Sequence, residues 1–332
     1  ASRISFRCAF DLARLHACAR IYSTRLTAGA HVLRVRAVDP KGRQSATTVV
    51  RVTAVAPAPS VKVGIEPVNI AAGAGSVWVA NLTSGTVTRI DTATAKAAAT
   101  IQVGGQPSGV AFADGSAWIG NYGNGTVTRI DPATNTVVAK IQAKGQPLAL
   151  AAGADGTIWA ANFDGSVERI DPATNAVTAR ITVGGQADTI AVGFGKVWAG
   201  NQDGSVTAID AATSKLTGIR TVVDRDTDAL AVSDTGVWVS TFYSGTVVLL
   251  DPTSGVVAQK LTLHGQASGL LIASGSLWAS VYDHGEVVRI DPQSAKIAAS
   301  TLVGTKPRDL AYAGGSIWVV NELSDSVSHF AP

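Results

Sequence analysis

The sequence predicts an all-β protein in which a seven-bladed β-propeller, closed by an N-terminal outer strand, follows a small β-sandwich module. The seven tryptophans recur at spacings of 39 to 41 residues, at Trp78, Trp118, Trp159, Trp198, Trp238, Trp278 and Trp318. Around them, "SGTVTRIDTAT" (84–94) returns as "NGTVTRIDPAT" (124–134) and "DGSVERIDPAT" (164–174). A period of about 40 residues that contains four short strands is typical of a propeller blade.

Each repeat contains four β-branched, alternating runs separated by Gly, Asn, Asp and Pro, as expected for short antiparallel strands. In the second repeat these are "SGVAFA" (108–113), "SAWIGN" (116–121), "GTVTRID" (125–131) and "TVVAKIQ" (136–142). Pairs such as Asp203-Gly204 supply the tight turns in which φ is positive. The Asp that ends each third strand can accept backbone N–H bonds in the next turn, so we interpret it as part of the scaffold.

The seventh repeat, "PRDLAYAGGSIWVVNELSDSVSHFAP" (307–332), contains only three strands. The missing outer strand is available in "SVKVGIEP" (60–67), directly before the first complete repeat. Pairing these two segments would remove the exposed edges of an open sheet. We therefore expect residues 60–332 to form the seven-bladed propeller.

The first 55 residues do not follow this repeat. "GAHVLRVRAVDPKGRQSATTVVRVTAV" (29–55) resembles the last strands of a bacterial immunoglobulin-like or fibronectin-type module, and "APAPS" (56–60) is typical of a linker. Such modules contain about 100 residues, so the module at 1–55 lacks an opening strand or two. Either the module has been trimmed, or a partner strand completes it and allows assembly by strand addition.

The repeats themselves resemble the YVTN/NHL-like bacterial propellers, as "PSGVAFADGSAWIGNYGNGTVTRIDPATNTVVAKIQ" (107–142) illustrates. The resemblance covers about 270 residues of the chain. It implies the fold but not the function, because this family includes enzymes, sensors and adhesive surface modules.

Composition excludes some classes of function. Charged residues make up 15% of the chain, the net charge is +3 and no run of Lys and Arg occurs, so we expect no nucleic-acid partner. No apolar run approaches the roughly 20 residues that span a bilayer. Cys8 and Cys18 are the only cysteines, and we expect a disulfide, with two buried thiols as the alternative. A disulfide favours a secreted or cell-surface protein.

Comparison of the repeats with one another indicates candidate functional residues, because a position that differs from its counterparts is not explained by the scaffold alone. The matched positions of the innermost strands are Val68, Ser108, Leu148, Asp188, Asp228, Ser268 and Arg308. The upper face is formed by the loops that enter the innermost strands and those that join second to third strands. Numbered from the repeat of Trp78, blades 4–7 contain most of the charged residues and the histidines of these loops, so we expect a binding site on that side of the upper face. The candidate binding residues are Asp188, Asp228, Tyr243, His264, Tyr282, Asp283, His284, Arg308 and Asp309.

A second series follows the tryptophans by four residues and contains Leu82, Tyr122, Phe163, Gln202, Phe242, Tyr282 and Glu322. Its aromatic members either rim a pocket or extend the packing between blades. The asparagines three residues after Trp (Asn81, Asn121, Asn162, Asn201 and Asn321) are interpreted as strand-end hydrogen-bonding groups.

The alternation Asp224, Asp226 and Asp228 places carboxylates on one side of an extended chain, in the manner of a Ca²⁺ or Mg²⁺ site. The Gly and Glu of a calcium loop are replaced by Ala229 and Thr235, so ion pairs with Arg225 and Arg308 are the alternative use. We expect no cofactor apart from a Ca²⁺ or Mg²⁺ ion at these aspartates.

"VYDHGEV" (281–287) brings Asp283, His284 and Glu286 near His264, and such a cluster suits general acid–base chemistry. Streptogramin B lyases, which use His and Glu with a divalent metal, are similar propellers. The resemblance stops short of their Trp-Phe-x-Glu motif, since this chain has Trp-x-x-Asn. His284 also occupies a turn position, where His tolerates left-handed backbone.

We therefore expect an extracellular, non-enzymatic module that binds a protein or glycan ligand or assembles through residues 1–55. The alternative is a metal-assisted lyase or hydrolase that uses His264, His284 and Glu286.

Overall fold

The computed structural model describes residues 4–18, 28–54 and 56–332. The chain divides into two compact units, Ala1–Pro57 and Ala58–Pro332. Throughout the described ranges, the regular elements are strands, apart from two 3₁₀ turns, η1 (Tyr122–Asn124) and η2 (Glu322–Ser324). No helix in this part of the chain has the length and apolar character needed to cross a membrane. The chain is thus an all-β protein.

The second unit contains seven four-stranded antiparallel sheets. In spatial order, they are β6 (Pro67–Gly73), β7 (Ser76–Asn81), β8 (Thr86–Asp91) and β9 (Lys96–Gln102); β10 (Pro107–Ala113), β11 (Ser116–Asn121), β12 (Thr126–Asp131) and β13 (Thr136–Gln142); β14 (Pro147–Ala152), β15 (Ile158–Asn162), β16 (Ser166–Asp171) and β17 (Ala176–Thr182); β18 (Ala187–Gly193), β19 (Lys196–Asn201), β20 (Ser205–Asp210) and β21 (Lys215–Val222); β22 (Thr227–Val232), β23 (Val237–Thr241), β24 (Thr246–Leu250) and β25 (Val257–Thr262); β26 (Ala267–Ala273), β27 (Ser276–Val281), β28 (Glu286–Asp291) and β29 (Lys296–Leu302); and β30 (Pro307–Ala313), β31 (Ser316–Asn321), β32 (Ser326–Phe330) and β5 (Ser60–Lys62).

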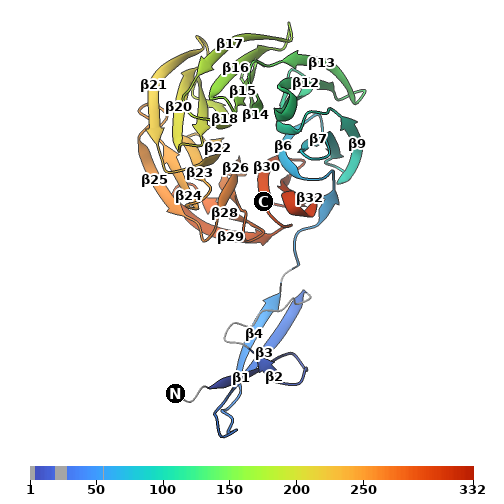
Figure 1. The fold of residues 1–332 in the computed structure, drawn as a ribbon, viewed down its shortest axis with the longest axis vertical. Coiled ribbons are helices and arrows are strands. Elements are labelled where there is room, and N and C mark those ends of the chain that lie inside the picture. Colours follow the sequence, from blue (N-terminus) through green and yellow to red (C-terminus); the bar gives the residue numbers. More distant parts are fainter. Residues whose placement is uncertain (1–3, 19–27, 55) are drawn as a thin grey trace. The chain divides into compact units, whose positions relative to one another are not determined.

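The seven sheets form a closed, propeller-like ring (Figure 1). The first strand of each sheet contacts the first strand of the next, and β30 contacts β6 to complete the cycle. The last sheet takes its outer strand from the start of the unit, since β5 pairs with β32 in the register Val61↔Val327. This pairing ties the two ends of the ring together.

Each tryptophan lies on the second strand of its sheet and packs against the following sheet. Trp78, for example, belongs to one core cluster with Val110, Ile119 and Ile130 of the next sheet, and Trp238 belongs to another with Leu270 and Leu277. All seven indoles are at most 3% exposed. Burying a side chain of this size stabilises the fold by roughly 3 kcal/mol, so the repeated Trp provides the core between neighbouring sheets.

The other repeated polar residues support the strands. The five asparagines after Trp are completely buried; Asn81 Nδ2, for example, donates to the hydroxyls of Thr86 and Thr88 at 3.0 and 2.9 Å. In six of the seven sheets an Asp ends or directly follows the third strand and accepts N–H bonds in its turn, as Asp91 does from Thr94 at 2.8 Å. These residues therefore serve the scaffold.

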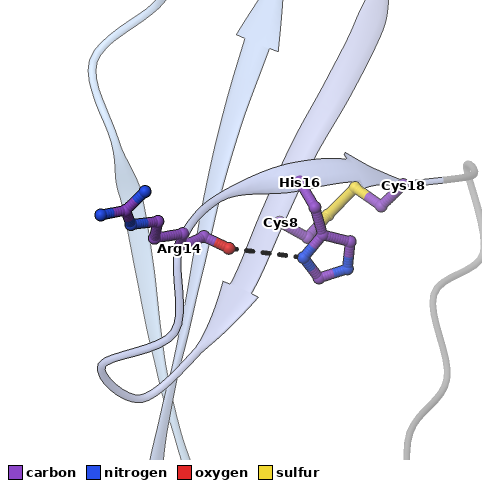
Figure 2. Close-up of a disulfide and its surroundings, with 4 residues drawn as sticks. All are labelled: Cys8, Arg14, His16 and Cys18. Carbon is purple, nitrogen blue, oxygen red and sulfur yellow. Dashed lines mark hydrogen bonds between the residues drawn. A yellow bond between two sulfur atoms is a disulfide. The ribbon is translucent and has the colours of Figure 1, made fainter.

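The first unit forms one antiparallel sheet in the order β2-β1-β3-β4. Its strands are β1 (Ser5–Phe10), β2 (His16–Cys18), β3 (Gly29–Val38) and β4 (Thr48–Ala54). The predicted Cys8–Cys18 disulfide is present and joins β1 to β2 (Figure 2). The predicted sandwich has no second sheet among the described residues, because the four strands all hydrogen-bond into one layer.

Candidate functional site

A cavity of about 690 Å³ lies among the innermost strands and is lined by residues from all seven sheets. Ligand sites for small molecules in proteins enclose roughly 300–1,000 Å³, so this volume suits a small ligand or one side group of a larger one. Five of the nine predicted binding residues line it, namely Asp188, Asp228, Tyr243, Arg308 and Asp309, and so does Asp226, which was predicted as a metal ligand. Comparison of the repeats therefore identified residues that the ring brings together.

The cavity wall changes character around the ring. On the sheets of β6 and β14 the matched innermost positions are apolar, at Val68 and Leu148. On those of β18, β22 and β30 they are Asp188, Asp228 and Arg308. The charged members of this series thus lie on one side of the ring, and the uncharged Val68, Ser108 and Leu148 lie on the first three sheets.

Asp188 is the least compensated acid of this wall. Its Oδ1 atom is buried and has no hydrogen-bond donor among the described residues. Burial raises the pKa of Asp188 to about 7, the charges of Asp226 and Asp228 add to the rise, and a hydrogen bond from Gln202 opposes it. The carboxyl group is therefore divided between its neutral and charged forms near neutral pH.

Asp228 and Arg308 form part of a second polar group at the cavity. The Ser268 hydroxyl donates to Asp228 Oδ2, and Arg308 Nε donates to Glu322 Oε2. Burial raises the pKa of Asp228, while the positive charge of Arg308 opposes the rise. Arg308 is thus already engaged by Glu322, and it compensates Asp228 only in part.

Asp309 has a structural role as well. Its Oδ2 accepts from the backbone N–H of Ile70 on β6 at 3.3 Å, so it links the last sheet to the first. Asn69 makes the equivalent link, because its Oδ1 accepts from Val110 at 2.9 Å. Burial raises the pKa of Asp309 to about 7 although its backbone hydrogen bonds oppose the rise.

Aromatic side chains surround part of the cavity. Tyr122 and Phe163 line it and meet edge to face with ring centroids 5.6 Å apart. Phe242, also in the lining, contacts Tyr243 at 5.4 Å and Tyr282 at 5.1 Å. Tyr282 stands just behind the lining, between Phe242 and the guanidinium of Arg308, which lies 5.3 Å from its ring. Both interpretations of this series are therefore partly right, since the rings pack on each other and some face the cavity.

The three alternating aspartates do not form a common ligand set. The described residues contain no group of three or more His, Cys, Asp or Glu side chains that could hold a metal ion. Asp226 and Asp228 line the cavity, whereas Asp224 is held in its own loop by the backbone N–H of Arg225 at 2.8 Å. The aspartates separate because the chain turns at Asp226, where φ is +62°.

The histidine cluster forms, but it lies outside the cavity lining. The rings of His264 and His284 are 5.0 Å apart, His264 Nε2 hydrogen-bonds Glu286 Oε1, and His284 Nδ1 lies 3.2 Å from Asp283 Oδ1. His284 does not take the left-handed conformation considered for its turn, because Gly285 does so with φ of +68°. The cluster is therefore a separate polar group on the sixth sheet.

Three residues of the cavity region were not named as binding residues. The sequence pattern identifies Asp226 only as a candidate metal ligand. Gln202 and Glu322 belong to the series four residues after each Trp, in which only the aromatic members indicate a pocket. The signal for Gln202 and Glu322 is their departure from the repeat, because the preceding repeats carry Phe163 and Tyr282 at the matched positions.

Comparison with known proteins supports the fold alone. No protein-family model matches the sequence, and no curated protein matches it either. A solved structure described as hydrazine synthase of Kuenenia stuttgartiensis is similar, with a TM-score of 0.71 and 16% identity. The match covers 80% of this chain and 96% of that chain. Since 1483 chains of solved structures match, the fold is widespread and does not indicate an activity.

Proposed function

We propose that this chain is an extracellular or cell-surface binding module without enzymatic activity, built on a seven-bladed propeller of the YVTN/NHL-like kind. The observation that carries the proposal is the 690 Å³ cavity at the innermost strands, whose wall combines aliphatic, aromatic and charged residues. Binding sites combine apolar walls with a few convergent polar groups in this way. The disulfide between Cys8 and Cys18 supports an oxidising compartment.

The lining also favours binding over catalysis. The described residues that line the cavity include no histidine. Ser108, one of its hydroxyls, donates to the carbonyl oxygen of Pro147 at 2.9 Å and not to a general base. Ser268 donates to the carboxylate of Asp228, but no histidine among the described lining residues extends that pair, so the lining favours recognition.

A cavity-blocking variant tests the proposal. Leu148→Trp adds a large side chain to the wall, whereas Leu216→Trp makes the same change on the outer strand β21, where Leu216 is 52% exposed. We expect ligands found by screening the full chain for thermal stabilisation to lose binding in the first variant and keep it in the second. Ligands that bind both variants equally would place the site elsewhere.

The N-terminal module is proposed to be an immunoglobulin-like docking element for a protein or glycan surface or for a second copy of the chain. Its sheet ends in β4, whose Val49 and Val50 are 52% and 45% exposed. Self-association through this edge predicts that particle mass rises with concentration for the full chain and not for a chain that begins at Ala58. A constant monomer for both chains would contradict the assembly role.

The second candidate function is a metal-assisted lyase or hydrolase at the histidine cluster. The 5.0 Å approach of His264 and His284 and the bond from His264 to Glu286 favour its acid–base chemistry. The described residues provide no group of three or more His, Cys, Asp or Glu ligands for its metal ion. It predicts that any turnover found for the chain disappears in a His264→Ala, His284→Ala double variant. Turnover that survives the double variant would eliminate this candidate.

A further inference from the structure

The charges at the cavity do not balance. Glu66, Asp188, Asp226, Asp228 and Asp309 line it, and Arg308 is the one basic residue among the described lining residues. Glu322 already accepts the Arg308 Nε–H. A buried carboxylate without a positive partner is costly, so this wall favours a ligand that brings positive charge.

No basic group of the described residues is among the charges that act on Asp188. Asp188 Oδ1 is buried and lacks a donor among the described residues, although it belongs to a residue of the cavity wall. Most buried polar atoms in proteins are hydrogen-bonded, and an exception is expected to have a role. Asp226 and Asp228 both act electrostatically on Asp188, so the negative charge of this wall is concentrated around Asp188.

The rest of the wall suits an organic cation better than a bare metal ion. The described carboxylates are not grouped as metal ligands. Leu148 lies on β14, next to the β18 strand that carries Asp188. Phe163 and Phe242 also line the cavity and can face a cation or an apolar body.

We propose that the cavity binds an amphipathic ammonium compound, with its positive group against Asp188, Asp226 and Asp228 and its apolar body against Leu148, Val68 and the aromatic residues. This inference rests on the proposed binding function and names the ligand class for the same cavity. The ammonium group offsets the negative charge that Arg308 leaves uncompensated on this wall.

Binding of such a ligand is linked to protons. Burial holds the pKa of Asp188 at about 7, with Asp226 and Asp228 as the other charged groups that act on it and Gln202 as its hydrogen-bond donor. Arg308 in turn acts on Asp226 and Asp228. Because the charged form of Asp188 attracts the ammonium group, affinity increases as pH rises from 5.5 to 8.

The experiment measures binding to the full chain by calorimetry, at pH 5.5 and 8. The probes are 2-phenylethylamine, tryptamine and benzyltrimethylammonium, each with a neutral alcohol or hydrocarbon analogue and a carboxylate analogue of the same body, together with CaCl₂ and MgCl₂ alone. We expect the ammonium probes to bind at least tenfold more tightly than their analogues, and about tenfold more tightly at pH 8 than at pH 5.5.

Two isosteric variants localise the effect. Asp188→Asn should weaken the ammonium probes at least tenfold and reduce their pH dependence. Part of that dependence remains, because Asp309 also lines the cavity and burial raises its pKa to about 7. Asp210→Asn lies on β20 of the same sheet but outside the cavity lining, and it should leave their binding unchanged.

Each other outcome overturns the ligand class. Equal or tighter binding of neutral or carboxylate probes would refute the cationic ligand while the cavity remains a binding site. Binding of Ca²⁺ or Mg²⁺ without the ammonium probes would assign the acids to a metal. If no probe binds, the ammonium proposal fails, and the Leu148→Trp screen decides separately whether the cavity binds anything.

Discussion

Replacing Asp188 by Asn should stabilise the protein, by an amount that grows with pH. In the folded chain burial raises the pKa of Asp188 from 3.8 to about 7. Above pH 3.8 the unfolded chain loses this proton while the folded chain keeps it, so the carboxyl group increasingly favours unfolding up to about pH 7. Above pH 7 both states are ionised and the penalty is constant. Asn has the same shape and no charge, so it avoids the penalty.

The magnitude follows from the same values. A rise from 3.8 to about 7 corresponds to at most about 4 kcal/mol, since one pKa unit is worth about 1.4 kcal/mol. Solvent in the open cavity screens the charge, so we expect about 1–2 kcal/mol at pH 8. For a chain of this size that amounts to an increase of roughly 3–6 °C in the melting temperature.

Thermal melting of both proteins at pH 5, 6, 7 and 8 measures the effect. The difference between Asn and Asp should increase from pH 5 to 7 and then stay level. Asp210→Asn is the control with the opposite sign, because hydrogen bonds from Thr213 lower the pKa of Asp210 and the uncharged amide oxygen of Asn accepts the same bonds more weakly. A destabilising Asp188→Asn change at pH 8, or a difference that does not vary with pH, would refute the reasoning.

Two predictions concern the scaffold and are measured by chemical unfolding. Trp118 Nε1 donates to the main-chain carbonyl five residues earlier at 3.1 Å, whereas Trp238 Nε1 has no partner among the described residues. Trp118→Phe should therefore lower the free energy of unfolding by about 1 kcal/mol more than Trp238→Phe does. Equal losses would contradict a role for that hydrogen bond. A Cβ at Gly204, where φ is +79°, would lie 1.3 Å from the carbonyl oxygen of Asp224, so Gly204→Ala should cost about 3 kcal/mol or more. Gly195→Ala has a similar φ of +68° with open space around it, and it should cost only about 1–2 kcal/mol; similar losses at both sites would show that backbone strain alone matters.

The scaffold could be predicted from the sequence because every repeat solves the same packing problem. A Trp on the second strand of each sheet must fill the space against the next sheet, so its spacing reports the size of one sheet. The tight turns depend on local backbone conformation, which pairs such as Asp203-Gly204 determine within a few residues. Neither property needs information about the rest of the molecule.

The cavity could be predicted only in part. Asp188, Asp228 and Arg308 stood out because the matched positions in other repeats are Val, Ser or Leu. The separation of the histidine cluster from the cavity was not predictable in this way. Repeat position determines where a residue lies along its sheet, but side-chain direction and distance from the ring axis determine whether it lines the cavity.

The sites that depart from the repeat are also those where the chain gives up stability. Val68 and Leu148 show that an aliphatic residue fits the innermost position, so the fold does not require the acid at 188. That acid leaves a buried oxygen without a donor and raises its own pKa to about 7. A residue that destabilises the scaffold and faces a cavity is expected to be explained by what the cavity holds. If Asp188→Asn stabilises the chain and also abolishes ammonium binding, Asp188 has a role in binding and none in stabilising the fold.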